Sequence, residues 1–230
     1  MIIRYSLTAT ADMVARRFLA DVPEGYTSQF NAAPSHLLPI ITQDSPQGIS
    51  FFYWGGPPSL ANKKPLGEKI INTKSELIAE KSVLQKKLIE KRCIIPADGF
   101  YQWKKAGKKT TIPYRFTLKD KDLFSIAGLW EEYEDEAGKA FHTFTMITTE
   151  ANASVLPVAE RMPLILNPTH EKQWLETYKM DVLFEILKNT QPSLDFYSVS
   201  PMVNNPDKND RLVIIPAPAS DQFGNLTLFD

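Results

Sequence analysis

Polar side chains that could do chemistry gather in a few short stretches of the chain. Asn72, Lys74 and Glu76 set an amide, a cation and a carboxylate at the expected start of a helix. Such groups donate and accept hydrogen bonds and carry both signs of charge. The stretch 96–103 holds an Asp-Gly turn signal inside an aromatic strand, and 159–163 holds a Glu-Arg pair. Taken singly, each stretch also fits a helix cap, a turn or a strand bulge.

Metal and nucleotide chemistry find little support in the sequence. His36, His142 and His170 do not pair with another histidine or cysteine at a ligand spacing, so we expect structural or surface roles for them. We expect no metal and no cofactor. Cys93 lies in an apolar strand-like run and is expected to be a small buried residue. The phosphate-binding glycine loops and the nucleophile-elbow serine motif are absent.

The composition indicates an ordinary globular chain of 230 residues with a net charge of -1 and a pI of about 6.3. This charge gives no global field that would attract nucleic acid, so any such site must be a local patch. A single cysteine excludes an internal disulfide framework. Neither a secretory signal pattern nor a long apolar run is visible, and we expect a cytoplasmic protein.

The elements that must position these stretches are mainly short strands. Helical periodicity favours helices over 12–20, 75–91, 171–178 and 181–187, with Thr73 and Glu76 as a possible capping box for the second. Strands outnumber helices and do not alternate with them. We therefore predict an α+β fold with a mainly antiparallel, barrel-like core and a few flanking helices, in one domain over 1–230. The strand-like runs are 49–54, 93–103, 114–118, 124–133, 142–148, 164–165 and 194–199.

Five of the stretches, in their order along the chain, resemble the motifs of the SOS-response-associated peptidase-like (SRAP) family. The family motifs read Asn-Ala-Arg-x-Glu, Pro-Ala-Asp-Gly-Phe-Tyr-Glu-Trp, Thr-Thr-x-Ala-Asn, His-Asp-Arg-Met-Pro and Val-Asn-Asn-Pro. Their counterparts here are Asn72–Glu76, Pro96–Trp103, Thr148–Asn152, Ala159–Pro163 and Val203–Pro206. Members of the family bind single-stranded DNA and shield abasic sites, so the resemblance implies a DNA partner of that kind.

The resemblance also implies a covalent reaction. Family members begin Met-Cys-Gly-Arg, and removal of the methionine exposes a cysteine with an amine and a thiol. That pair captures the aldehyde of an opened abasic sugar and closes a thiazolidine ring. A glutamate in the aromatic strand and a histidine before Asp-Arg-Met-Pro assist proton transfer.

This chain departs from the family at each of those positions. Ile2 has no thiol, Gln102 stands for the glutamate, and Ala159 stands for the histidine, while Asn72 is retained. Glutamine does not exchange a proton near neutral pH. Because the whole cooperating set is replaced, we predict that the chain cannot form the thiazolidine crosslink and name no catalytic residue with assurance. Glu160 and Asp98 lie beside the vacant positions in sequence and are the candidates to replace the missing groups.

The resemblance further implies a DNA-binding set that combines cations for phosphates with flat side chains for bases. Lys74 stands where the family has arginine, and it keeps the charge but loses the planar fork. In the alternative reading, Trp54 and Trp103 are core aromatics and Arg161 pairs with Glu160. The predicted DNA-binding residues are Arg4, Trp54, Asn72, Lys74, Trp103 and Arg161.

The hypothesis from sequence is thus a family member that retains the fold and the DNA groove but has lost the chemistry. Two rival hypotheses stay open. The first is residual enzyme activity, either as a peptidase or as a lyase that forms a Schiff base through the Met1 amine. The second is a scaffold protein that no longer binds DNA.

Overall fold

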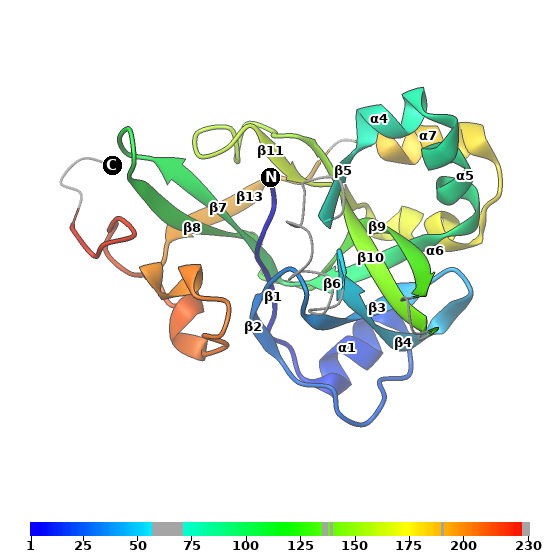
Figure 1. The fold of residues 1–230 in the computed structure, drawn as a ribbon, viewed down its shortest axis with the longest axis horizontal. Coiled ribbons are helices and arrows are strands. Elements are labelled where there is room, and N and C mark those ends of the chain that lie inside the picture. Colours follow the sequence, from blue (N-terminus) through cyan, green and yellow to red (C-terminus); the bar gives the residue numbers. More distant parts are fainter. Residues whose placement is uncertain (57–70, 135–137, 139, 190, 227–230) are drawn as a thin grey trace.

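Two β-sheets enclose the main apolar core in a computed structural model that describes residues 1–56, 71–134, 138, 140–189 and 191–226 (Figure 1). The first sheet has the strand order β13-β8-β7-β1-β2, and all of its pairs are antiparallel. Its strands are β1 (Tyr5–Leu7), β2 (Gln29–Ala32), β7 (Gly99–Lys105), β8 (Thr111–Leu118) and β13 (Leu194–Ser198).

The second sheet closes on itself. β10 pairs with β4 on one edge and with β9 on the other, and β3 and β6 complete the ring. The predicted barrel-like, mainly antiparallel α+β core is therefore confirmed, and the chain forms a single domain. The strands of this sheet are β3 (Leu37–Thr42), β4 (Ser45–Trp54), β5 (Asn72–Lys74), β6 (Arg92–Ala97), β9 (Phe124–Glu134), β10 (Ala140–Glu150), β11 (Arg161–Pro163) and β12 (Ile165–Leu166).

The chain leaves the barrel and enters the first sheet at Asp98 and Gly99. The strand-like run 93–103 is therefore split into β6 and β7, which belong to different sheets. A Cβ atom on Gly99 would lie 2.7 Å from Nε of Arg115, so glycine leaves room here for the Arg115 guanidinium. Asp98 accepts hydrogen bonds from Ser6 Oγ at 2.7 Å and from Arg115 at 2.8 Å. These bonds fix β1 against β7, and they thereby also position the N-terminal segment, residues 1–4.

Helices flank the barrel (Figure 1). α1 (Ala11–Phe18), α6 (Pro168–Glu176) and α7 (Met180–Leu187) lie within a few residues of the predicted ranges. The uninterrupted helix predicted over 75–91 is wrong, because Lys81 is extended and separates α4 (Ser75–Glu80) from α5 (Ser82–Glu90). The break lets Ile78 and Leu88 both reach the core, where both are fully buried. No helix in the described ranges is long and apolar enough to cross a membrane.

The predicted capping box at α4 is also wrong. The N-cap residue is Lys74, no side chain caps the helix, and Thr73 belongs to β5. The carboxylate of Glu76, which a capping box would turn back to the N-cap, instead binds Arg161. This ion pair joins α4 to β11 at the site described next.

Candidate functional site

The N-terminal segment lies between β7, β11 and β5 (Figure 1). The side chain of Ile2 is fully buried in the main core, at the position where the family resemblance places a nucleophile. The backbone carbonyl of Ile2 accepts a hydrogen bond from Nδ2 of Asn72 at 2.7 Å. A packed hydrocarbon thus fills this position, and the retained asparagine holds the backbone beside it.

Gln102 lies on β7 directly beside this segment, because Tyr101 N donates to the carbonyl of Arg4 at 3.1 Å. The Gln102 side chain is 4% exposed, and its Nε2 donates to the backbone carbonyl of Arg161 at 2.6 Å. An ionised carboxylate has no proton to donate and could not make this bond. The amide is therefore part of the packing of the site and does not fill an acid–base role.

Ala159 is the third replaced position. It lies in the turn that precedes β11 and packs against the same core that holds Ile2. Its methyl group offers no atom that can transfer a proton. The neighbouring Glu160 is exposed, while Asp98 is bonded to Ser6, Thr8 and Arg115 at the far end of β1. Asp98 is therefore engaged away from Ile2 and does not fill the vacancy.

Arg161 at the start of β11 is held by a bidentate ion pair. Its two terminal nitrogens lie 2.8 and 3.0 Å from the carboxylate of Glu76, and one of them also donates to the Thr148 carbonyl at 2.7 Å. Burial alone would raise the pKa of Glu76, but the hydrogen bonds and charge of Arg161 hold that pKa below its ordinary value. The expected alternative partner, Glu160, is thus wrong, and the partner is Glu76.

Arg4 is a buried cation held by backbone carbonyls. Its side chain donates to the carbonyls of Ile3 at 2.7 Å and Asn204 at 3.2 Å, and its Nε has no hydrogen-bond partner in the part of the chain that the structure describes. Among the described residues, no carboxylate lies within ion-pair distance of it. Burial lowers the pKa of Arg4 from its ordinary value, and the charge of Arg4 adds to burial in lowering the pKa of His36. Within the described ranges, no carboxylate therefore balances the Arg4 charge of this site.

The two tryptophans have different environments. Trp54 is fully buried, its Nε1 donates to the Ile71 carbonyl at 2.8 Å, and its ring stacks on Phe144. Its faces are covered by core side chains, so the prediction that Trp54 stacks on a base needs correction. Trp103 is half-buried, and its Nε1 donates to Oδ1 of Asn204 at 2.8 Å. It packs against the cluster of Tyr101, Val199, Val203 and Val213 and keeps part of its surface exposed.

A cavity of about 390 Å³ opens beside Asn72 and Lys74. The apolar side chains of Leu77 and Leu84 from α4 and α5 line its other wall. Lys74 is exposed, whereas Asn72 is buried and its Oδ1 finds no hydrogen-bond partner among the residues that the structure describes. The structure thus brings Arg4, Asn72, Lys74, Trp103 and Arg161 around the N-terminal segment and leaves Trp54 in the core.

Comparison with known proteins decides the family. Residues 1–206 match the SOS response associated peptidase (SRAP) family. The chain belongs to this family. Among similar proteins, Abasic site processing protein YoqW of Bacillus subtilis is 38% identical over 214 residues, which are 90% of this chain and 95% of that protein. Abasic site processing protein HMCES of Rattus norvegicus is 26% identical over 236 residues, which cover 85% of this chain and 67% of HMCES.

Solved structures share the fold of this SRAP chain. A protein from Bacteroides thetaiotaomicron superposes with a TM-score of 0.79 at 26% identity and covers 94% of this chain and 99% of its own. A protein from Bordetella bronchiseptica gives a TM-score of 0.72 at 22% identity, over 86% of this chain and 99% of its own. The second likeness concerns the fold alone.

Two sets of contacts in the SRAP site escaped the sequence reasoning. The backbone carbonyl of Asn204 accepts a hydrogen bond from Arg4, and its side chain accepts one from Trp103. The carboxylate of Glu76 forms an ion pair with Arg161. Both residues lie in motifs that the sequence shows, and these motifs were the only signal for them. Their partners lie far away along the chain, so the motifs do not indicate the contacts. In the described part of the chain, no group of three His, Cys, Asp or Glu residues could hold a metal ion.

Proposed function

We propose that this SRAP protein binds single-stranded DNA at the site around Arg4 and does not form a covalent crosslink with an abasic sugar. The observation that carries the proposal is Arg4, a residue only 9% exposed whose guanidinium bonds to backbone carbonyls and to no carboxylate among the described residues. A buried charge of this kind gains most from an anion that completes its hydrogen bonds. A phosphate group of DNA supplies such an anion.

The neighbouring residues support a nucleic-acid ligand over a small anion. Lys74 offers a second, exposed cation, and Trp103 offers a half-buried aromatic side chain. Cations that bind phosphates and aromatic rings that stack on bases are the usual components of single-strand binding sites. The names of the relatives as abasic site processing proteins support DNA as the ligand class.

The absence of covalent chemistry is proposed from the three replaced positions. Ile2 carries no thiol and is buried, Gln102 donates a hydrogen bond as an amide, and Ala159 carries no proton-transfer group. Nucleophilic catalysis needs a nucleophile and a base within hydrogen-bond reach. None of these three side chains provides either group.

Fluorescence anisotropy with a labelled single-stranded oligonucleotide tests the binding proposal. We expect an affinity that falls with salt, with a log–log slope of about -0.7 for each phosphate contact. The variant Lys74→Gln should make the negative slope shallower by about 0.7 and weaken binding severalfold. The variant Lys179→Gln removes the same charge from an exposed position beside α7 and should change neither quantity. Wild-type protein that does not bind at low salt would refute the proposal.

A further inference from the structure

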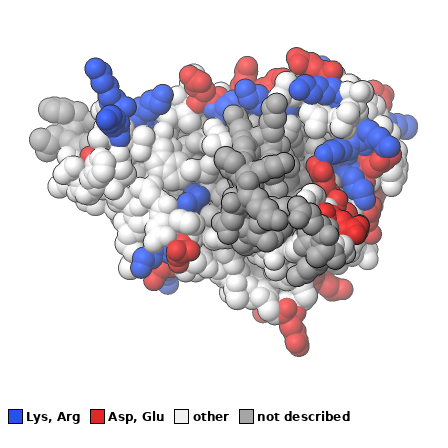
Figure 2. Space-filling model, viewed as in Figure 1, with Lys and Arg blue, Asp and Glu red and all other residues white. Residues whose placement is uncertain are grey.

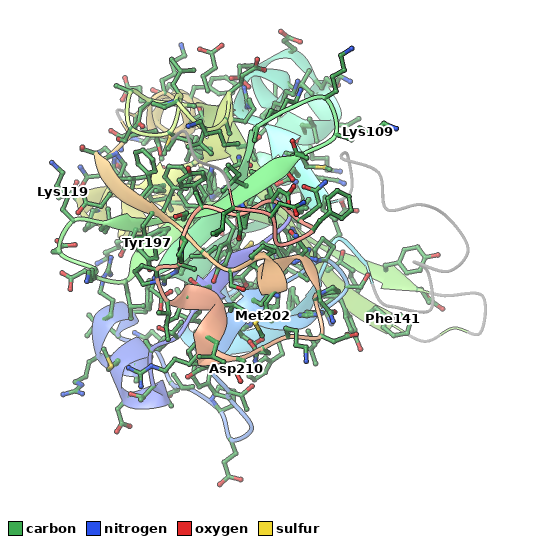
Figure 3. All side chains as sticks on the ribbon, turned by 90° about the vertical axis from the view of Figure 1, so that its left-hand side faces the viewer. Lys109, Lys119, Phe141, Tyr197, Met202 and Asp210 are labelled. Atoms are coloured by element: carbon green, nitrogen blue, oxygen red, sulfur yellow. The ribbon has the colours of Figure 1, made fainter. Side chains whose placement is uncertain are left out.

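The hairpin of β7 and β8 concentrates positive charge next to the candidate site. Its segment 104–109 contains four lysines, and no acidic residue occurs between 99 and 119. Lys105, Lys108 and Lys109 are exposed, and none of them forms an ion pair with a carboxylate among the described residues. Figure 2 shows a group of blue side chains in this region at the upper left, and Figure 3 labels Lys109 on the hairpin.

A continuous series of contacts connects Arg4 to this hairpin. The Arg4 guanidinium donates to the Asn204 carbonyl, and the side chain of the same Asn204 accepts from Trp103 Nε1. Trp103 and Lys105 lie two residues apart on β7, so their side chains project from the same face of the strand. The Arg4 charge, the Trp103 ring and the exposed Lys105 therefore follow one another from the site to the hairpin.

The hairpin is also held in a fixed position. Gln222 Nε2 donates to the backbone carbonyl of Lys109 at 2.5 Å, and Gln222 Oε1 accepts from Thr111 N at 2.8 Å. Both bonds use backbone groups of the hairpin, so they leave the lysine side chains unoccupied. Lys105 lies two residues beyond Trp103, which is about 7 Å along a strand.

We propose that Lys105, Lys108 and Lys109 bind the phosphates of the single-stranded DNA that flanks the Arg4 site. The strand leaves Arg4, passes the ring of Trp103 and continues along β7 to the turn of the hairpin. The surface combines cations with an aromatic ring, which is the arrangement that single strands prefer. This inference rests on the proposed function, because it extends the same DNA past the site.

The test compares two triple variants with equal loss of charge. The hairpin variant is Lys105→Gln/Lys108→Gln/Lys109→Gln. The control variant is Lys172→Gln/Lys179→Gln/Lys188→Gln, which changes exposed lysines on and beside α6 and α7, at the opposite end of the molecule (Figure 1). Each protein is titrated by fluorescence anisotropy at several salt concentrations. The ligands are short and long single-stranded oligonucleotides of about 5 and about 15 nucleotides, respectively.

For the long oligonucleotide, we expect the hairpin variant to make the negative slope of log affinity against log salt shallower by about 2. Its binding should weaken roughly tenfold or more near 0.1 M salt. The short oligonucleotide should bind the hairpin variant as it binds the wild type, and the control variant should match the wild type for both. If the hairpin and control variants bind the long oligonucleotide equally, the hairpin proposal fails while the proposed function stands.

Two further outcomes would also overturn the hairpin proposal. If the wild type binds neither oligonucleotide at low salt, the proposed function fails together with it. If the hairpin variant loses binding to phosphatidylserine vesicles but not to DNA, the lysines serve a membrane surface instead.

Discussion

The carboxylate of Glu76 holds both terminal nitrogens of Arg161, at 2.8 and 3.0 Å. An arginine in this geometry is already paired with an anion that has the charge and fork-like shape suited to a guanidinium. In the proposed complex, a DNA phosphate would therefore compete with Glu76 for Arg161. By contrast, Arg4 has no such competitor among the described residues, so we expect the two arginines to contribute unequally to the proposed DNA binding.

The variant Glu76→Gln should bind single-stranded DNA more tightly than the wild type. Loss of the carboxylate frees Arg161 and removes a negative charge, so we expect the dissociation constant to fall roughly threefold to tenfold at about 0.1 M salt. Fluorescence anisotropy measures the change. The variant Glu80→Gln removes the same charge from an exposed position at the end of α4 and should have little effect. Equal effects of the two variants would mean that Arg161 does not contact the DNA.

The same ion pair gives a pH dependence with a defined sign. The pKa of Glu76 is lower in the folded protein than in the unfolded chain, so the pair stabilises the fold above the ordinary glutamate pKa of about 4.3. This stabilisation is lost as the pH falls through the folded value. The difference in urea midpoint between the wild type and Glu76→Gln should therefore be largest near neutral pH and shrink in acid.

The variant Gln102→Glu should destabilise the protein at neutral pH. An ionised carboxylate would face the Arg161 carbonyl without a proton to donate, which costs about 1–3 kcal/mol for a buried polar group. A protonated carboxyl group can donate this bond, so the loss should decrease as the pH falls towards about 5. Urea denaturation at both pH values measures the effect. The exposed variant Gln173→Glu provides the control, and equal stability of the two variants at neutral pH would contradict the role of the Gln102 bond.

Arg92 should be essential for the stability of the helical flank. Its fully buried guanidinium donates to carbonyls at the ends of two helices, Ile89 in α5 at 2.7 Å and Trp174 in α6 at 2.5 Å. Lysine lacks the planar fork that reaches both helices at once. We expect Arg92→Lys to lower the free energy of unfolding by about 3 kcal/mol, because buried carbonyls lose charged donors. Chemical denaturation checks this, with the exposed Arg16→Lys as the control.

The fold was predicted well where strands are long and apolar. β9 and β10 were both predicted within a few residues, because their periodicity is local to the chain. β5 has three residues and β11 has three, and each exists because it pairs with β10. β3 contains Pro39, which normally counts against a strand. Elements of this kind depend on partners that lie far away in sequence, so local patterns do not indicate them.

The sequence named the residues of the candidate site but not their contacts. The positions of Ile2, Gln102 and Ala159 followed from the family motifs, and the structure brings them to one region. The pairing of Arg161 with Glu76 spans 85 residues and could not be read from either motif. Trp54 was assigned to DNA from the family resemblance, and the strand pattern around it does not show which face of the strand meets the core. In the structure the Trp54 side chain is fully buried, so it cannot stack on a base.

The central claim is that the site binds DNA without forming a covalent bond. The most direct measurement incubates the wild-type protein with single-stranded DNA that carries one abasic site, followed by a denaturing gel. A parallel sample with borohydride reports a Schiff base, which is the reaction of the lyase alternative. Without borohydride, we predict no heat-stable shifted band, because Ile2, Gln102 and Ala159 supply no nucleophile or base. A heat-stable band formed without reductant would contradict the claim.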